Sequence, residues 1–231
     1  FALFMQKNNS PARVKGVTVL VHDYIDSYEN PRRAWSYSPA TRRVRRAPDI
    51  TYDTLVNASP LIVVDQYGTF NGAQDKYNWE LKGVKKMVVA GVNNALGNNP
   101  LEVTHGVGHL NPEYVSYEEK EVAVVHATLK EGQRHLYASR TFYVTTDAFY
   151  IVSQDIYDGK GNLMRHALNT ITTEVAGLDG GCTINAEATF DFATRQYAVN
   201  NMLGSAINSQ PAVYNGPSKD VSFYTPDGLR R

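Results

Sequence analysis

Four extended runs follow one another between Glu118 and Val175, and short links rich in turn-forming residues join them. The runs are Glu121–Lys130, Arg134–Thr145, Ala148–Tyr157 and Asn162–Val175. The links are Glu131-Gly132-Gln133, Thr146-Asp147 and Asp158-Gly159-Lys160-Gly161. Because connections this short join neighbouring antiparallel strands, the segment predicts an antiparallel meander.

Apolar residues recur on one face of these runs, so the predicted sheet needs a cover. The residues that carry this pattern are Tyr150, Val152, Ile156, Leu163, Ala167 and Ile171. No run of helical periodicity is long enough to cover such a sheet, which must therefore curl or pack on a second sheet. We predict a mostly β fold built on a large curved antiparallel sheet, either a barrel, a half-barrel or a sheet packed on a second one, with one or two short helices in the connections. We expect residues 1–231 to form a single β domain.

Further strands are expected on either side of the meander. Arg13–Tyr24 is a run rich in β-branched residues, and Cys182–Val199 is another alternating run. Tyr77–Val92 is predicted as two strands separated by a turn near Lys82-Gly83. The segment Asp53–Asp75 is expected to be a loop with at most one short helix, and the chain from Asn200 on to be tail and loop.

Charge and cysteine content exclude several classes of protein. The 23 Lys and Arg balance 23 Asp and Glu, which argues against a general nucleic-acid binder. The single cysteine, Cys182, excludes an internal disulfide or a cysteine metal cluster. Apolar runs are far shorter than the roughly 20 residues of a membrane helix, so we expect a peripheral protein. The first residue is Phe1 rather than Met, so we expect that a segment upstream of it has been removed.

The sequence offers no positive case for an enzyme, a metal site or a cofactor. No serine lies in the G-x-S-x-G setting of a hydrolase, and no phosphate-binding glycine loop is present. His105 and His109 have a spacing that suits zinc on a helix, but two glycines separate them and the catalytic glutamate is missing. We therefore predict no catalytic residues, no metal and no cofactor.

An arginine-rich hairpin is the sharpest local feature. Arg32–Tyr37 and Arg42–Ala47 flank a turn at Ser38-Pro39-Ala40-Thr41. Alternation places Trp35 and Tyr37 on one face and separates Arg43 and Arg45 from Arg42 and Arg46. So many guanidinium groups repel one another unless anions pair with them. Three alternatives can balance this charge: internal carboxylates with a solvated face, an anionic head group or partner surface, or nucleic acid. The neutral total charge disfavours nucleic acid.

These residues also carry a family resemblance. The hairpin reads RAWSYSP over 33–39 and RRVRRAP over 42–48, followed by Tyr52-Asp53. Later matching stretches are Phe70-Asn71-Gly72, YNWEL at 77–81, HLNP at 109–112, RTFY at 140–143, Tyr157-Asp158 with Gly161, FYTP at 223–226 and Leu229-Arg230-Arg231. From about residue 13 to its end, the chain resembles a proteobacterial family of unknown function described as outer-membrane-lipoprotein-sorting-protein-like. Two loops depart from the family pattern, Ala90–Asn93 and Glu113–Glu118, so nothing is carried over from them.

The resemblance implies the open half-barrel of the periplasmic carriers LolA and LolB, and a chain that is the carboxy-terminal part of a longer, secreted precursor. It also implies partners: a transporter of the resistance-nodulation-division type and an outer-membrane barrel protein. We accordingly expect a periplasmic, non-enzymatic binding or shuttle protein for a lipid, acyl chain or hydrophobic compound. The alternative is a structural or adaptor subunit whose groove is filled by its own side chains. The expected groove lining or rim is Trp35, Tyr37, Arg43, Arg45, Trp79, Phe142 and Tyr150.

Overall fold

The computed structural model describes residues 2–47, 52–56, 59–174, 180–200 and 219–230. Their contacts group into two compact units. Unit 1 comprises Phe1–Thr54, Ala73–Asp75 and Pro217–Arg231, and unit 2 comprises Leu55–Gly72 and Lys76–Gly216. The expectation of a single β domain stays a prediction.

The predicted fold class is confirmed. The described residues form two antiparallel sheets, one of four strands and one of seven, and neither sheet closes on itself within this part of the chain. Two short helices, α1 (Asn94–Asn98) and α2 (Leu101–Thr104), lie in a connection, as expected. No described helix has the length and apolar character needed to cross a bilayer.

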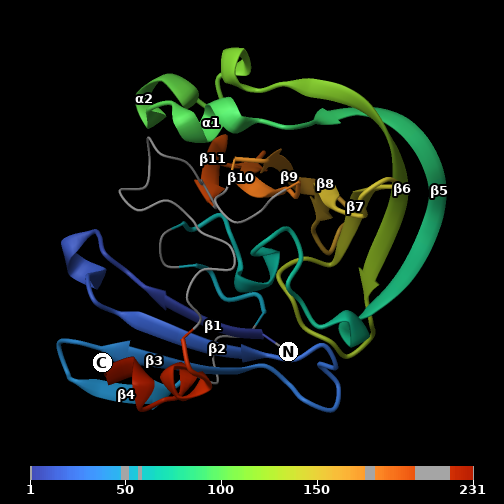
Figure 1. Cartoon of the computed structure of the whole chain (residues 1–231). Helices are drawn as coiled ribbons and strands as arrows, with labels where there is room; N and C mark the ends of the chain where they lie inside the picture. The colour runs from blue at the N-terminus through green and yellow to red at the C-terminus, as the bar shows by residue number, and fades with distance from the viewer. Residues whose placement is uncertain (1, 48–51, 57–58, 175–179, 201–218, 231) are drawn as a thin grey trace. The chain divides into compact units, whose positions relative to one another are not determined.

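Unit 1 is a four-stranded meander, with the predicted arginine hairpin at one edge (Figure 1). Its strands are β1 (Ala2–Lys7), β2 (Thr18–Asp23), β3 (Arg33–Ser38) and β4 (Arg43–Arg46). The carboxy-terminal segment, with one-turn 3₁₀ helices at Val221–Tyr224 and Gly228–Arg230, contacts β1, β2 and β3. The carbonyl oxygen of Tyr224 lies 2.8 Å from Nε2 of His22, and Leu229 is buried. The described end of the segment expected to be tail and loop therefore contributes to the core of unit 1, whereas residues 201–218 lie outside the described residues.

The strand predicted at Arg13–Tyr24 is shorter than expected. Ala12–Val14 forms a 3₁₀ turn, and Gly16 has a φ of +82°, which interrupts an extended backbone. The strand begins only at Thr18.

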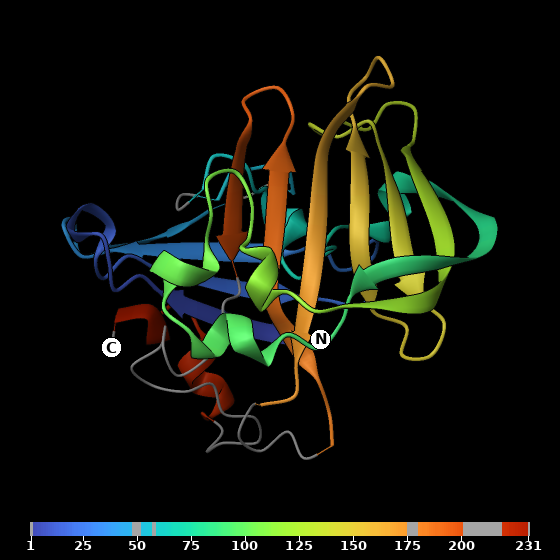
Figure 2. The ribbon, with the colours of Figure 1, turned by 90° about the horizontal axis from the view of Figure 1, so that it is seen from above.

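Unit 2 contains the predicted meander within a seven-stranded sheet of order β11-β10-β9-β8-β7-β6-β5. Figure 2 shows these strands side by side. Their bounds are β5 (Tyr77–Ala90), β6 (Tyr117–Leu129), β7 (Ser139–Thr145), β8 (Ile151–Tyr157), β9 (Leu163–Thr172), β10 (Thr183–Asp191) and β11 (Gln196–Asn200). The run predicted as one strand at Cys182–Val199 is a hairpin, because Arg195 takes a φ of +56° and turns the chain between β10 and β11.

The turn predicted near Lys82-Gly83 is wrong. β5 continues through this point as one strand of 14 residues, paired with β6 along its whole length. Gly83 has a φ of +130° and lies at a break in register between Leu81 and Gly83, which is a β-bulge. A glycine inside a strand pattern marks a bulge as readily as a turn, and here the bulge lets the long hairpin bend.

The prediction of one continuous apolar face is also wrong. Val152 is an extra residue at a register shift between β7 and β8, since Tyr143 pairs with Ser153 and Val144 with Ile151. The shift moves Val152 and Ile156 to different apolar clusters. Val152 packs with Val89 and Val122, and Ile156 packs with Val63 and Tyr137. Both faces of the sheet therefore hold apolar residues.

Both faces of the unit 2 sheet are covered by the chain itself. On one face lies the segment Leu55–Gly72, called the strap below, which buries Leu61, Ile62 and Val63. On the other face, residues 90–115 place Leu96, Leu110 and Val115 against Ala186 and Ala188 of β10. The β5–β6 hairpin curves over this second face until it reaches α1 (Figure 1), and Val92 bridges to Ile171 of β9.

Candidate functional site

A buried ion pair fixes the strap to the sheet. The guanidinium of Arg140 donates to a carboxylate oxygen of Asp65, and Nε2 of His135 lies 3.0 Å from the same oxygen. Arg140 is completely buried, and its guanidinium lies over the rings of Phe70, Tyr77 and Tyr137. Burial alone would raise the pKa of Asp65, but Arg140 and His135 outweigh it and lower that pKa. Asp65 is thus held as a carboxylate.

Uncharged donors and a second ion pair complete the attachment of the strap. The side chain of Gln66 bonds Thr189 at 2.6 Å and the hydroxyl of Tyr137 at 2.9 Å. Arg165 pairs with Asp191 at 2.9 Å and donates to the carbonyl oxygen of Leu61 at 2.8 Å. The carboxylate of Glu187 accepts from the backbone amides of Gly68 and Thr69. This part of the sheet face is therefore filled by the chain's own polar groups and does not offer an apolar groove.

An aromatic cluster lies at the other end of the same face. Trp79 stacks on Phe142 with ring centroids 5.9 Å apart, and Phe70 meets both edge-on at 5.4 Å. Tyr77 joins the cluster 5.8 Å from Trp79. Phe142 is 2% exposed, whereas Trp79 is 41% exposed. The cluster therefore opens to solvent at Trp79.

Exposed apolar side chains continue from Trp79 along β5. Trp79, Leu81 and Val84 pair with Ala127, Val125 and Ala123 of β6, so they share one face despite the bulge. Val88 lies further along the same face, beyond Lys86, which forms an ion pair with Glu119. The exposed fractions of Leu81, Val84 and Val88 are 65%, 55% and 67%. We call Trp79, Leu81, Val84 and Val88 the apolar stripe. A row of exposed apolar residues on an edge strand is unusual for a soluble surface and indicates an interaction site.

The opposite face of the sheet carries a small polar cluster. Asp155 accepts from the hydroxyl of Tyr143 at 2.7 Å and lies 2.7 Å from Nδ1 of His166. Burial alone would raise the pKa of Asp155, but these two contacts lower it. Burial and the bond to Asp155 raise the pKa of Tyr143. Both carboxylate oxygens are occupied, so the cluster orders the sheet and presents no free base.

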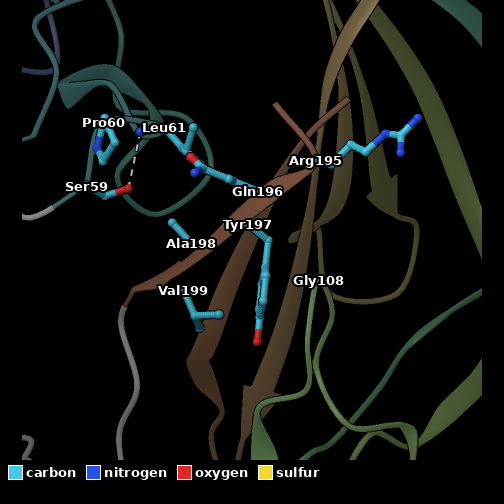
Figure 3. A pocket seen from close by; sticks show the side chains of 9 residues that line it. All are labelled: Ser59, Pro60, Leu61, Gly108, Arg195, Gln196, Tyr197, Ala198 and Val199. Atoms are coloured by element: carbon cyan, nitrogen blue, oxygen red, sulfur yellow. Dashed lines mark hydrogen bonds between the residues drawn. The ribbon is translucent and has the colours of Figure 1, made fainter. Parts of the chain in front are cut away.

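A cavity of about 580 Å³ runs along β11 (Figure 3). Its lining is Ser59, Pro60, Leu61, Gly108, Arg195, Gln196, Tyr197, Ala198 and Val199. The volume lies in the range of small-molecule sites. However, the guanidinium of Arg195 points away from the other lining residues in Figure 3. The hydroxyl of Tyr197 donates to the carbonyl oxygen of Gly106 at 2.9 Å, so this polar group is already used.

The histidine pair considered for zinc does not converge. α2 ends at Thr104, so His105 and His109 do not share a helix. Nδ1 of His105 contacts the hydroxyl of Thr104, and Nδ1 of His109 contacts the carbonyl oxygen of Leu110. Across the described residues, no group of three or more His, Cys, Asp or Glu side chains is placed to hold a metal ion.

Comparison with known proteins places the chain in a family. A family model described as "Protein of unknown function (DUF1329)" matches residues 1–230. The chain belongs to the DUF1329 family. An uncharacterized protein of Pseudomonas aeruginosa is 33% identical over 241 residues, which cover 99% of this chain and 50% of that protein. The chain thus spans about half the length of this curated relative.

Solved structures show the same fold at low identity. A domain from Vibrio parahaemolyticus, described as that of an outer membrane lipoprotein-sorting protein, has a TM-score of 0.60 at 14% identity and covers 99% of this chain and 77% of that one. A DUF1329 protein from Desulfovibrio piger has a TM-score of 0.60 at 17% identity, with 97% and 75% covered. A LolA superfamily protein from Nitrosomonas europaea has a TM-score of 0.54 at 11% identity, with 98% and 77% covered. The expected resemblance and LolA-like fold are confirmed.

The expected site residues of this DUF1329 chain fall into separate groups. Trp79 and Phe142 stack together as described above, whereas Tyr150 packs against the Val122 and Val152 cluster on the opposite face. In unit 1, Tyr37 pairs with Val44 and Trp35 with Arg46. Their roles in binding stay predictions. The remaining two expected residues, Arg43 and Arg45, pair with Ser38 and Ser36 on the other face of the hairpin.

The strap contacts were not predicted from the sequence of this DUF1329 chain. Arg140 and Phe142 alternate on one face of β7, and Arg165 and Ala167 on one face of β9. A charged residue on an apolar strand face needs a buried counter-charge. The position of these two arginines was therefore the sequence signal that a buried carboxylate lies nearby. Its partner Asp65 lies 75 residues away in a segment without periodicity, so the sequence does not identify it.

Proposed function

We propose that this chain is a periplasmic, non-enzymatic carrier that holds a lipophilic molecule against the apolar stripe. The observation that carries the proposal is the continuity of the stripe, through Trp79, with the buried Tyr77 and Phe142 and the partly buried Phe70. Burying an exposed aliphatic side chain contributes about 1.5 to 3 kcal/mol, so a ligand that covers Leu81, Val84 and Val88 gains enough to be held. The LolA-like fold supports this class of ligand.

The proposal includes work with an envelope transport system. A resistance-nodulation-division type transporter and an outer-membrane barrel protein are the partners that the family resemblance implies. A carrier that exchanges its ligand with such partners needs an accessible binding face rather than a sealed cavity, and the stripe is accessible. The protein would act as a peripheral component.

The alternative is an adaptor subunit, and the strap favours it. The strap fills the middle of the sheet face with polar side chains that bond to the chain itself, as a self-filled groove requires. In that case the stripe would contact another protein instead of a lipid.

Tryptophan fluorescence separates the two functions. The chain has two tryptophans, Trp35 and Trp79, so Trp35→Phe leaves Trp79 as a single reporter on the stripe. We expect a doxyl-labelled fatty acid to quench Trp79 with saturation, and a double Leu81→Glu and Val84→Glu variant to lose the quenching. Ile25→Glu with Val221→Glu is the matched control, since both residues are exposed apolar residues of unit 1. No saturable quenching, together with no lipid in solvent extracts of the purified protein, would favour the adaptor.

A further inference from the structure

The β4 strand and the turn before it carry four arginines that form no ion pair with the rest of the described chain. Arg43, Arg45 and Arg46 lie on β4, Arg42 lies in the preceding turn with a φ of +53°, and all four are exposed. Among the described residues, none of the four forms an ion pair. We call Arg42, Arg43, Arg45 and Arg46 the arginine edge, because β4 ends the order β1-β2-β3-β4 of its sheet.

A nearby arginine shows the contrast. Arg32 donates two hydrogen bonds to Asp23, through Nε at 3.1 Å and Nη2 at 2.6 Å, and its guanidinium lies over the ring of Tyr52. Its side chain is 5% exposed. This arginine is used inside the fold, whereas the arginine edge projects into solvent. Internal carboxylates are the first alternative for the hairpin. Of Arg32 and the four arginines of the edge, only Arg32 pairs with such a carboxylate.

The charge of the neutral chain is divided unequally between its two units. Unit 1 holds 12 of the 23 Lys and Arg and 8 of the 23 Asp and Glu, which leaves 11 basic and 15 acidic residues for unit 2. The excess positive charge of unit 1 equals the four residues of the arginine edge. A local basic surface on a neutral protein directs binding to anionic partners at that surface, whereas the rest of the molecule does not bind anions non-specifically.

We propose that the arginine edge docks on the surface of an anionic lipid bilayer through contacts of guanidinium groups with lipid phosphates. Arginine matches phosphate with paired N–H donors. Register places Arg43 and Arg45 on one face of the hairpin and Arg46 on the other, beside Trp35. Of the two hairpin strands, only β4 is an edge strand, and its exposed arginines lie on both faces. Mobile head groups can reach both sets of guanidinium groups, whereas a rigid acidic protein would need a matching slot. The proposal is independent of the apolar stripe.

Charged residues on an edge strand have a second use, which is to prevent pairing with strands of other molecules. That role needs no anion. It predicts that the arginine edge does not bind bilayers, so vesicle binding distinguishes the two roles.

The test is flotation of the purified chain with vesicles of phosphatidylcholine alone or with 30 to 40% phosphatidylglycerol. We expect binding only to the anionic vesicles, and release at high salt because surface charges are screened within about 8 Å already at 0.15 M. Arg43→Gln with Arg45→Gln should weaken binding about 30-fold, since each basic residue at a membrane surface contributes about 1 kcal/mol. Arg43→Lys with Arg45→Lys should retain most of the binding.

The matched control removes the same charge elsewhere. Lys130 and Lys160 are exposed residues of unit 2, and Lys130→Gln with Lys160→Gln should leave vesicle binding unchanged. Equal losses in the arginine and lysine variants would overturn the proposal, because net charge alone would then explain binding. Absence of binding to anionic vesicles would also overturn it, as would arginine-dependent binding to polyglutamate without vesicle binding, which would indicate an acidic protein partner. Circular dichroism of each variant shows that the fold is kept.

Discussion

Trp79 and Phe142 stack with ring centroids 5.9 Å apart and an interplanar angle of 26°, although they come from β5 and β7, with β6 between them. One ring is exposed and the other is buried. The pair therefore joins the core of unit 2 to the apolar stripe. Its position explains why a sheet whose centre is sealed by the strap still presents an apolar surface.

Phe142→Ala should destabilise the protein by about 3 to 5 kcal/mol, because it leaves a cavity beneath Trp79 and Phe70. Phe149→Ala is the matched control: Phe149 is 81% exposed, and its loss should change the unfolding free energy by less than about 0.5 kcal/mol. Urea unfolding measured by circular dichroism checks both values. Similar losses for the two variants would contradict the packing of Phe142 described above.

Asp65→Asn should destabilise the protein by about 3 to 5 kcal/mol at neutral pH, since it leaves the buried Arg140 without its counter-charge. The lowered pKa of Asp65 also gives a pH dependence. Its stabilisation is fully present above the ordinary value of 3.8 and is lost as the pH falls through the lowered value. Urea midpoints between pH 7 and pH 2 should therefore fall less steeply in the variant.

The control for this pair is Glu131→Gln, which removes an exposed carboxylate from a turn of unit 2. It should reproduce the acid sensitivity of the unchanged protein. If Asp65→Asn gave the same pH profile as Glu131→Gln, the strap would not depend on the Asp65 carboxylate.

The sequence predicts where the strands of this protein lie better than it predicts which face of the sheet each side chain occupies. Short links between Glu121 and Val175 determine the meander, and these local signals act within a few residues. The effect of Gly83 and of Val152 depends on the partner strand, because the same residue can lie in a turn, a bulge or a regular ladder. A register shift of one residue then moves each following side chain to the other face. The strap was missed for another reason: its contacts join residues far apart in the chain.

Tyr143→Phe should raise the pKa of Asp155. The carboxylate then keeps His166 but loses the hydroxyl that donates to Oδ2 at 2.7 Å, and hydrogen bonds to the charged form lower a carboxyl pKa. Carbon-detected NMR titration of the Asp155 side chain measures the change. Tyr28→Phe, at an exposed residue of unit 1, should leave the titration of Asp155 where it is. An unchanged pKa in Tyr143→Phe would mean that the hydroxyl does not bond Asp155 in solution.

Gly228→Ala should loosen the carboxy-terminal segment from the sheet of unit 1. A Cβ at Gly228 would lie 2.0 Å from the carbonyl oxygen of Phe223, so the backbone of one 3₁₀ turn must move away from the other. Overpacking of this kind costs about 1 to 3 kcal/mol. Gly159→Ala is the matched control, since a Cβ there meets nothing within 4 Å. Hydrogen exchange should show faster exchange at Val221–Tyr224 and at β2 in Gly228→Ala only, and equal exchange in both variants would show that this segment does not pack on β2.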